Sequence, residues 1–117
     1  MRNKFTRRPV DRLLPGMQKG ADWTLPTCVY VISSMGRTKV GIATDPQVRM
    51  GYLQLACPFE LKLEVSVAFP TRREARDVER ALHVEFATDR LWGEWFNVEA
   101  APMIEALRQR EPVTPAV

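Results

Sequence analysis

The chain has 117 residues, of which 45% are hydrophobic and 26% are charged, with a formal net charge of +3. This length suits a single domain of ordinary globular composition. No apolar run approaches the roughly 18 residues that a membrane span needs, and no secretory signal is expected, so we expect a cytoplasmic protein without a membrane partner. The two cysteines lie far apart and outside any paired motif, which predicts reduced thiols and, with a single histidine, no zinc site.

Positive charge is concentrated at the N-terminus. Residues 1–27 hold six Lys or Arg against two Asp, a net charge of +4, whereas the remaining residues hold eleven against twelve Asp or Glu, a net charge of −1. Prolines and glycines interrupt any long element there, so we expect residues 1–26 to be a flexible basic arm. The arm either adds salt-dependent affinity for nucleic acid or only keeps the protein in solution.

Residues 28–43 predict a β-hairpin, because two β-branched runs flank a turn centred on Met35-Gly36. In this register Tyr30 faces Gly41 and Ile32 faces Lys39. Side chains alternate between the two faces of a strand. The phenol and the ammonium therefore share one face, with a notch at the glycine where a ligand could approach. The opposite face is entirely apolar and is expected to be core; it comprises Val29, Val31, Val40 and Ile42.

A helix is predicted from Pro46 to Ala56, because Asp45 suits the N-cap and Pro46 suits the first helical position. Its expected apolar stripe comprises Val48, Tyr52, Leu55 and Ala56, with Leu53 at the margin. Arg49 lies at the edge of this stripe. It either needs a partner, because it is partly desolvated, or packs only its stem and extends its head into water.

A third strand is predicted over Phe59–Phe69, with Leu61, Leu63, Val65 and Val67 on one core face. A second helix follows over Arg72–Ala87, opened by Thr71 and Glu74 as a capping box. Its apolar stripe comprises Ala75, Val78, Leu82 and Phe86.

Glu79 flanks this second stripe, and Arg72, Arg76 and His83 lie further around the same side of the helix. A carboxylate at the border of the core, beside cationic residues, is a candidate for a metal ligand or a phosphate site. The alternative is a weak pairing of Glu79 with Arg76 or His83 on the helix surface. After this helix, the aromatic segment 91–97 is expected to close the edge of the domain, and Asn97 to cap a last helix over Val98–Leu107.

The order of these segments resembles the GIY-YIG nuclease superfamily, in particular its small phage and bacterial branch named after a phage T5 reading frame. The residues that carry the resemblance are Val-Tyr-Val, Lys-Val-Gly, an Asp-Pro helix with Arg49, Val-Glu-Arg-Ala-Leu-His, and Gly-Glu-Trp-Phe. The resemblance covers about Thr27 to Val98 and implies an α/β fold with a small three-stranded antiparallel sheet flanked by helices. It places a GIY-YIG-like nuclease domain at residues 27–110, between the arm and a disordered tail at 111–117.

The resemblance also implies roles for single residues. Tyr30 matches the tyrosine that takes the proton from the attacking water, Arg49 the arginine on the scissile phosphate, and Glu79 the single carboxylate that holds the metal, Mg²⁺ or Mn²⁺. Gly41 matches a motif glycine, and His83 a histidine typical of this branch. Asn97 lies near a late asparagine of the superfamily and, like Gly41, is expected to contact substrate. Apart from the resemblance, the position of Arg72 and Arg76 beside Glu79 predicts that they contact substrate as well.

Lys39 is the main departure, because it stands where most of the superfamily has its second tyrosine. Some restriction-enzyme relatives resemble this arrangement, and a lysine beside Tyr30 is expected to lower the pKa of the phenol. The resulting hypothesis is a metal-dependent DNA endonuclease that uses an oligomer or a partner protein for targeting. The alternatives are a catalytically weak DNA-binding or adaptor module of the same fold, and a structural or interaction protein.

Overall fold

The computed structural model describes residues 22–112. The expected arm therefore lies outside the described residues, apart from its last five positions, and so does most of the expected tail. Both stay predictions. Within the described residues, no helix is long and apolar enough to cross a membrane.

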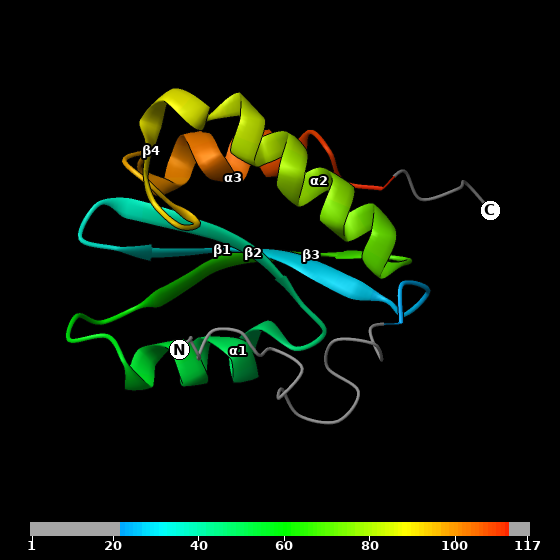
Figure 1. Ribbon diagram of the computed structural model, residues 1–117, viewed down its shortest axis with the longest axis horizontal. Helices are drawn as coiled ribbons and strands as arrows, with labels where there is room; N and C mark the ends of the chain where they lie inside the picture. Colours follow the sequence, from blue (N-terminus) through cyan, green and yellow to red (C-terminus); the bar gives the residue numbers. More distant parts are fainter. Residues whose placement is uncertain (1–21, 113–117) are drawn as a thin grey trace, which may run out of the picture.

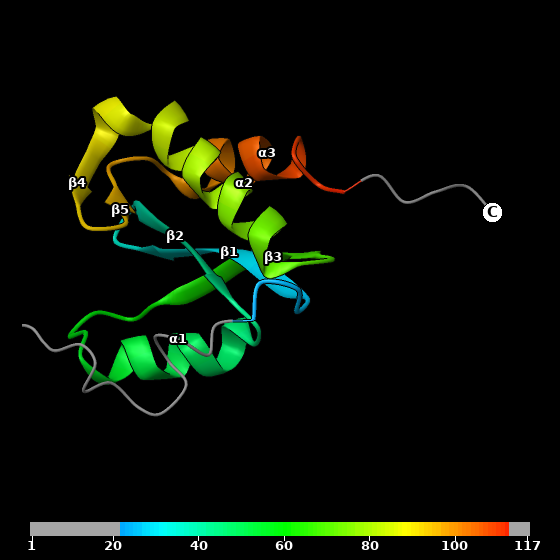
Figure 2. The same ribbon diagram turned by 45° about the vertical axis from the view of Figure 1, so that its right-hand side comes forward.

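The described chain forms an α/β domain with one antiparallel sheet and three helices (Figures 1 and 2). The sheet has five strands in the order β3-β1-β2-β5-β4, so the prediction of three strands was too small. The strands are β1 (Thr27–Ser34), β2 (Arg37–Ala43), β3 (Lys62–Phe69), β4 (Arg90–Trp92) and β5 (Trp95–Phe96). The two short additions form a hairpin from the aromatic segment, and β5 pairs with β2 at Thr38 and Lys39.

The β1–β2 hairpin has the predicted register, with Tyr30 opposite Gly41 and Ile32 opposite Lys39. Its turn residues Met35 and Gly36 both adopt positive φ, at 53° and 77°. Two left-handed residues in succession characterise the tight turn whose twist matches that of the strands, and such a turn fixes the register. The hairpin therefore defines which residues of β1 and β2 share a face.

Helices cover both faces of the sheet (Figure 1). On one face, α2 (Arg72–Glu85) and α3 (Ala100–Arg108) enclose the main core with the predicted apolar face of the hairpin. On the other face, α1 (Pro46–Leu55) covers a smaller cluster that contains Tyr30 and Ile32. The second face of the hairpin is therefore buried as well, except where a side chain reaches the edge of the sheet.

The apolar stripe predicted to pack α1 against the sheet was wrong. Val48, Tyr52 and Leu55 are 54%, 67% and 84% exposed. The helix instead packs Met50 and Leu53 against the smaller cluster. The start of the helix was predicted correctly, because the Asp45 side chain accepts a hydrogen bond from the backbone N–H of Val48.

The third strand also differs from its prediction, because its apolar residues serve both faces. A register shift between Val31 and Ile32 pairs Val31 with Val65 but Ile32 with Leu63. One extra residue in a strand reverses the alternation of its side chains. Val65 therefore packs in the main core and Leu63 in the smaller cluster.

Helix α2 begins as predicted, since the Thr71 hydroxyl accepts a hydrogen bond from the N–H of Glu74. Its predicted stripe packs against the sheet: Ala75 and Leu82 are fully buried, and Val78 and Phe86 are partly buried. The start of α3 differs from the prediction. Its N-cap is Glu99 rather than Asn97, because Asn97 donates its N–H to the Asp89 carbonyl and the Val98 carbonyl accepts from the Thr38 hydroxyl, which holds both residues outside the helix.

Candidate active site

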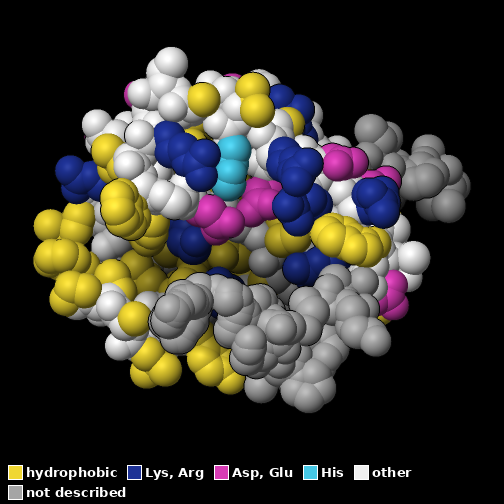
Figure 3. All heavy atoms as spheres, in the orientation of Figure 1, with side chains coloured by type: hydrophobic (Ala, Val, Ile, Leu, Met, Phe, Trp, Pro, Cys, Tyr) yellow, Lys and Arg dark blue, Asp and Glu magenta, His cyan; other side chains and the backbone are white. Residues whose placement is uncertain are grey.

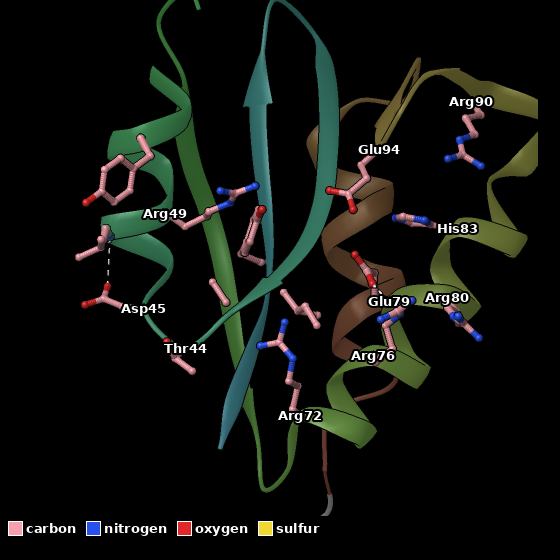
Figure 4. A pocket seen from close by; sticks show the side chains of 15 residues that line it. Thr44, Asp45, Arg49, Arg72, Arg76, Glu79, Arg80, His83, Arg90 and Glu94 are labelled. Carbon is pink, nitrogen blue, oxygen red and sulfur yellow. Dashed lines mark hydrogen bonds and ion pairs between the residues drawn. The ribbon is translucent and has the colours of Figure 1, made fainter. Parts of the chain in front are cut away.

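A cleft of about 760 Å³ lies beside the second half of β2, where β5 no longer pairs with this strand. Strand β5 pairs only with the first part of β2, up to Lys39. Beyond this point the helices on both faces of the sheet reach the same edge, and α1, α2 and the β4–β5 turn surround the cleft (Figure 4). Side chains from opposite faces of the sheet can therefore meet here.

At Val40, the first residue of β2 after Lys39, the backbone groups on the outer edge of the strand bond to the β4–β5 turn and to α2. The Val40 N–H donates to the Glu94 carbonyl oxygen at 3.3 Å, and the Val40 carbonyl lies 3.1 Å from Nε2 of His83. A carbonyl only accepts, so Nε2 of His83 carries the proton in this contact. His83 therefore lines the cleft while holding α2 against the edge of β2.

The Tyr30 hydroxyl reaches the cleft across Gly41. Tyr30 is 1% exposed and lies within the cluster under α1. A Cβ atom at Gly41 would lie 2.6 Å from Cζ of Tyr30 and closer still to its hydroxyl oxygen. Only a residue without a side chain leaves room for the phenol there. The notch predicted at Gly41 thus exists, and the Tyr30 side chain occupies it.

The pKa of Tyr30 is raised, chiefly because burial disfavours the phenolate. A hydrogen bond with Arg49 and the charge of its guanidinium counteract this shift, whereas the charges of Glu94 and Glu79 add to it. The Arg49 guanidinium, which projects from α1, therefore lies near enough to the Tyr30 hydroxyl to act on its pKa. The expectation that Lys39 lowers this pKa was wrong, because the Lys39 ammonium is held 2.6 Å from Oε1 of Glu94.

Two carboxylates face one another on the far side of the cleft from Arg49 (Figure 4). Glu79 is only 6% exposed, and Glu94 projects toward it from the β4–β5 turn. Burial, together with the charge and hydrogen bonding of Glu94, raises the pKa of Glu79 to about 7; Arg76 and Lys39 act in the opposite direction. Nε of Arg76 lies 3.7 Å from Oε1 of Glu79. The ion pair between Glu79 and Arg76 that the sequence offered as an alternative is therefore present, but it is loose.

Arginines surround these groups. Five line the cleft, against three carboxylates (Asp45, Glu79 and Glu94), and they comprise Arg49, Arg72, Arg76, Arg80 and Arg90. Three of the five project from α2 at intervals of four residues, which places them on one side of the helix. Basic, acidic and histidine side chains are accordingly gathered in the centre of the molecular surface in Figure 3. The cleft is thus suited to an anionic ligand.

The carboxylates of the cleft suit a magnesium ion better than a metal that takes all its ligands from the protein. Among residues 22–112, no group of three or more His, Cys, Asp or Glu could hold a metal. Mg²⁺ binds oxygen ligands, keeps several waters and commonly uses one or two carboxylates. Glu79 and Glu94 provide two carboxylates that face each other, and a cation between them would relieve their mutual repulsion.

Six of the sequence-predicted site residues line the cleft together: Tyr30, Arg49, Arg72, Arg76, Glu79 and His83. Lys39 and Gly41 lie beside it without lining it, and each acts on a residue that does. Asn97 does not line the cleft, and its N–H donates to the Asp89 carbonyl at 2.8 Å, so the structure does not bring it together with the other predicted residues.

The sequence reasoning did not assign four charged residues to the cleft, and they are Asp45, Arg80, Arg90 and Glu94. Asp45 was predicted only as the N-cap of the first helix. The four-residue spacing after Arg72 and Arg76 was a signal for Arg80. Glu94 belongs to the Gly-Glu-Trp-Phe segment, but nothing assigned it a role, and no local pattern indicated Arg90. The positions of both residues depend on the pairing of β5 with β2.

Comparisons with known proteins give one match. A family model described as the T5orf172 domain matches residues 27–111. No curated protein and no solved structure matches the chain significantly. The matched segment contains every strand and helix described above and all the residues that line the cleft. Because this match covers most of the sequence, the chain belongs to the T5orf172 domain family.

Proposed function

We propose that this protein is a metal-dependent DNA endonuclease of the GIY-YIG type. The observation that carries the proposal is the meeting of three groups in one cleft: the Tyr30 phenol from β1, the Arg49 guanidinium from α1 and the Glu79 carboxylate from α2. A folded core requires none of these polar groups at that point. The hydrolysis of a phosphodiester requires all three kinds of group.

The proposal assigns each of these residues a part in the reaction. Tyr30 takes a proton from the water whose oxygen forms the new bond to phosphorus. Arg49, which lines the cleft with Tyr30, stabilises the charge that develops on the phosphate oxygens as the bond to the leaving oxygen breaks. Glu79 and Glu94 would hold a divalent cation. When bound, this cation supplies charge stabilisation for the phosphate and the leaving oxygen.

The raised pKa of Tyr30 predicts how the rate of cleavage depends on pH. A raised pKa keeps most of the phenol protonated at neutral pH, so the base form is scarce. The fraction of phenolate rises about tenfold per pH unit below the pKa. Cleavage is therefore expected to accelerate between about pH 7 and pH 9.

DNA as the substrate is supported by the surplus of arginines over carboxylates in the cleft. Arginine presents a planar fork of donors that matches phosphate oxygens. The basic N-terminal segment adds a sequence-independent attraction to the same polymer. These features concern the phosphate backbone and carry no sequence preference.

The proposal is tested by nicking of supercoiled plasmid with Mg²⁺, with Mn²⁺ and with chelator. We expect nicking that depends on the metal and falls by about 10²–10⁴-fold in Tyr30→Phe and Glu79→Gln. The matched control is Glu85→Gln, which removes an exposed carboxylate from the other end of α2 and should keep the wild-type rate. Metal-independent nicking, or equal rates in Tyr30→Phe and wild type, would contradict the mechanism.

A DNA-binding module with little catalysis is the second candidate. It is favoured by the position of Lys39, whose ammonium is bound to Glu94 and does not assist Tyr30. This candidate predicts salt-sensitive DNA binding without nicking under any metal condition. The absence of both binding and nicking at low salt would instead favour a structural or interaction protein.

A further inference from the structure

Trp23 lies just before the segment matched by the family model, yet it packs against the wall of the cleft. Its carbonyl accepts a hydrogen bond from the Arg73 N–H at 3.2 Å. Three guanidinium carbons lie close to the centroid of its indole, at 5.6 Å for Arg72, 5.7 Å for Arg73 and 5.8 Å for Arg76. These distances are within the range of cation–π attraction. We call these four residues the Trp23 cluster.

The Trp23 cluster holds three like charges with little compensation. Among residues 22–112, only Arg76 of the three forms an ion pair, a loose one with Glu79. Among the same residues, Nε of Arg72 has no hydrogen-bond partner although it is buried. A buried donor without an acceptor is uncommon in native proteins. An anion bound between the guanidinium groups would balance their like charges.

The cluster also adjoins the cleft directly. Arg72 and Arg76 line the cleft, and a second hollow of about 200 Å³ next to it is lined by Trp23, Arg73, Arg76, Asp77 and Arg80. Arg76 and Arg80 belong to both hollows, so the basic surface runs from the cleft along the first turns of α2. In Figure 4, Arg72 and Arg76 extend from this helix, apart from Arg49 on the opposite wall.

We propose that the Trp23 cluster is a second phosphate subsite, which holds a backbone phosphate of the bound DNA away from the bond to be cut. The proposal rests on the proposed function, because it takes DNA as the ligand. Trp23 is a positioning residue: its ring holds the guanidinium groups together by cation–π contact, and their N–H donors remain available to phosphate oxygens. A polymer held at two points along its backbone has a fixed register in the cleft.

The test is DNA binding in the presence of chelator, so that no cleavage occurs. A short labelled duplex is titrated with protein at several salt concentrations, and fluorescence anisotropy gives Kd. We expect Trp23→Leu, Arg72→Gln and Arg73→Gln to weaken binding about 3–10-fold. For each arginine variant we also expect the slope of log K against log salt to fall by about 0.9 if one phosphate contact is lost. The matched controls Trp92→Leu and Arg108→Gln alter an exposed tryptophan and an exposed arginine outside both hollows, and should bind as wild type.

A conservative replacement separates positioning from general stability. Trp23→Phe keeps an aromatic face and should retain most of the affinity, whereas Trp23→Leu should not. If Trp23→Leu fails to fold, Arg73→Gln still tests the subsite, because Arg73 is exposed and contributes no core contact. Binding within twofold of wild type in folded Arg72→Gln and Arg73→Gln would overturn the proposal, and so would equal losses in the two controls.

The outcomes for the subsite and for the proposed function are separable. If wild type nicks plasmid and the cluster variants bind DNA normally, the subsite is refuted and the endonuclease stands. If wild type binds DNA through the cluster but never nicks, the subsite stands and the endonuclease fails. If wild type does not bind DNA at all at low salt, both are refuted.

Discussion

Gly41 decides where the Tyr30 hydroxyl can lie, and the reason is space rather than backbone conformation. The ring of Tyr30 is enclosed by the cluster under α1, so it cannot swing away from a new neighbour. Any Cβ atom at position 41 would collide with the phenol. The same contact therefore links the packing of the fold to the position of the candidate base.

Gly41→Ala is expected to destabilise the protein by about 1–3 kcal/mol, because a group is forced into a filled space. Gly51→Ala is the matched control. Gly51 lies within α1, and a Cβ atom there meets nothing within 4 Å. Because alanine favours the helix over glycine, the control should stabilise by roughly 0.5–1 kcal/mol. Urea unfolding measures both changes, and equal effects of the two substitutions would contradict the role of Gly41.

Glu79 is expected to make stability depend on pH in the direction opposite to that of most carboxylates. Its folded pKa of about 7 lies above the ordinary value of 4.5, so the folded state binds a proton that the unfolded state releases. Its stabilising contribution is complete below about pH 4.5 and is lost as the pH rises through 7. The apo protein should therefore lose stability between these values on account of this group.

Glu79→Gln removes this dependence, because a neutral amide replaces the carboxyl at every pH. Thermal unfolding in chelator should show that the variant gains several degrees over wild type at pH 8 and much less at pH 5. Glu85→Gln serves as the control and should change the Tm similarly at both values. A gain for Glu79→Gln that is equal at pH 5 and pH 8 would show that the proton is not the cause.

At the scale of elements, the ion pair between Lys39 and Glu94 joins β2 to the β4–β5 turn. Lys39 is 8% exposed, and its ammonium has a partner only because β5 pairs with β2 at this position. The pair orients Glu94 toward Glu79 and thus sets the spacing of the two carboxylates. Lys39 therefore influences the cleft through Glu94 rather than through Tyr30.

The elements that could be predicted from sequence are those in which a local motif fixes the strand register or the start of the helix. A two-residue turn with a glycine fixed the register of the β1–β2 hairpin, and Thr71 fixed the start of α2. Because these two elements carry Tyr30, Glu79 and most of the arginines, much of the candidate site followed from them. The sheet register and the helix stripe together were enough to bring these residues to one edge.

The errors arose where tertiary packing decides between equivalent patterns. Helix α1 has apolar residues on two sides, and the set with Met50 and Leu53 is spaced as regularly as the set with Val48 and Tyr52. No local rule chooses between them; the strands beneath the helix do. The register shift in β3 and the position of Glu94 likewise depend on partners distant in the sequence.

At the scale of the whole molecule, charge is divided between two parts of the chain. Residues 28–117 carry eleven Lys or Arg against twelve Asp or Glu, so the net positive charge lies in residues 1–27. The arginines of the cleft are thus set in a domain with slight negative charge overall. For the proposed DNA substrate, we therefore expect long-range attraction mainly from the N-terminal segment and short-range contact from the cleft.

Replacing Arg7, Arg8 and Arg12 together by Gln should therefore reduce the slope of log K against log salt for DNA binding by about 2–3. The rate of cleavage at saturating DNA should not change, because the cleft is intact. The matched control replaces Lys62, Arg108 and Arg110 by Gln, which removes the same charge from residues already paired with carboxylates. If both triple variants reduce the slope equally, net charge alone accounts for the attraction. A larger loss in the N-terminal variant assigns the attraction to contacts of that segment with DNA, since the two variants have the same net charge.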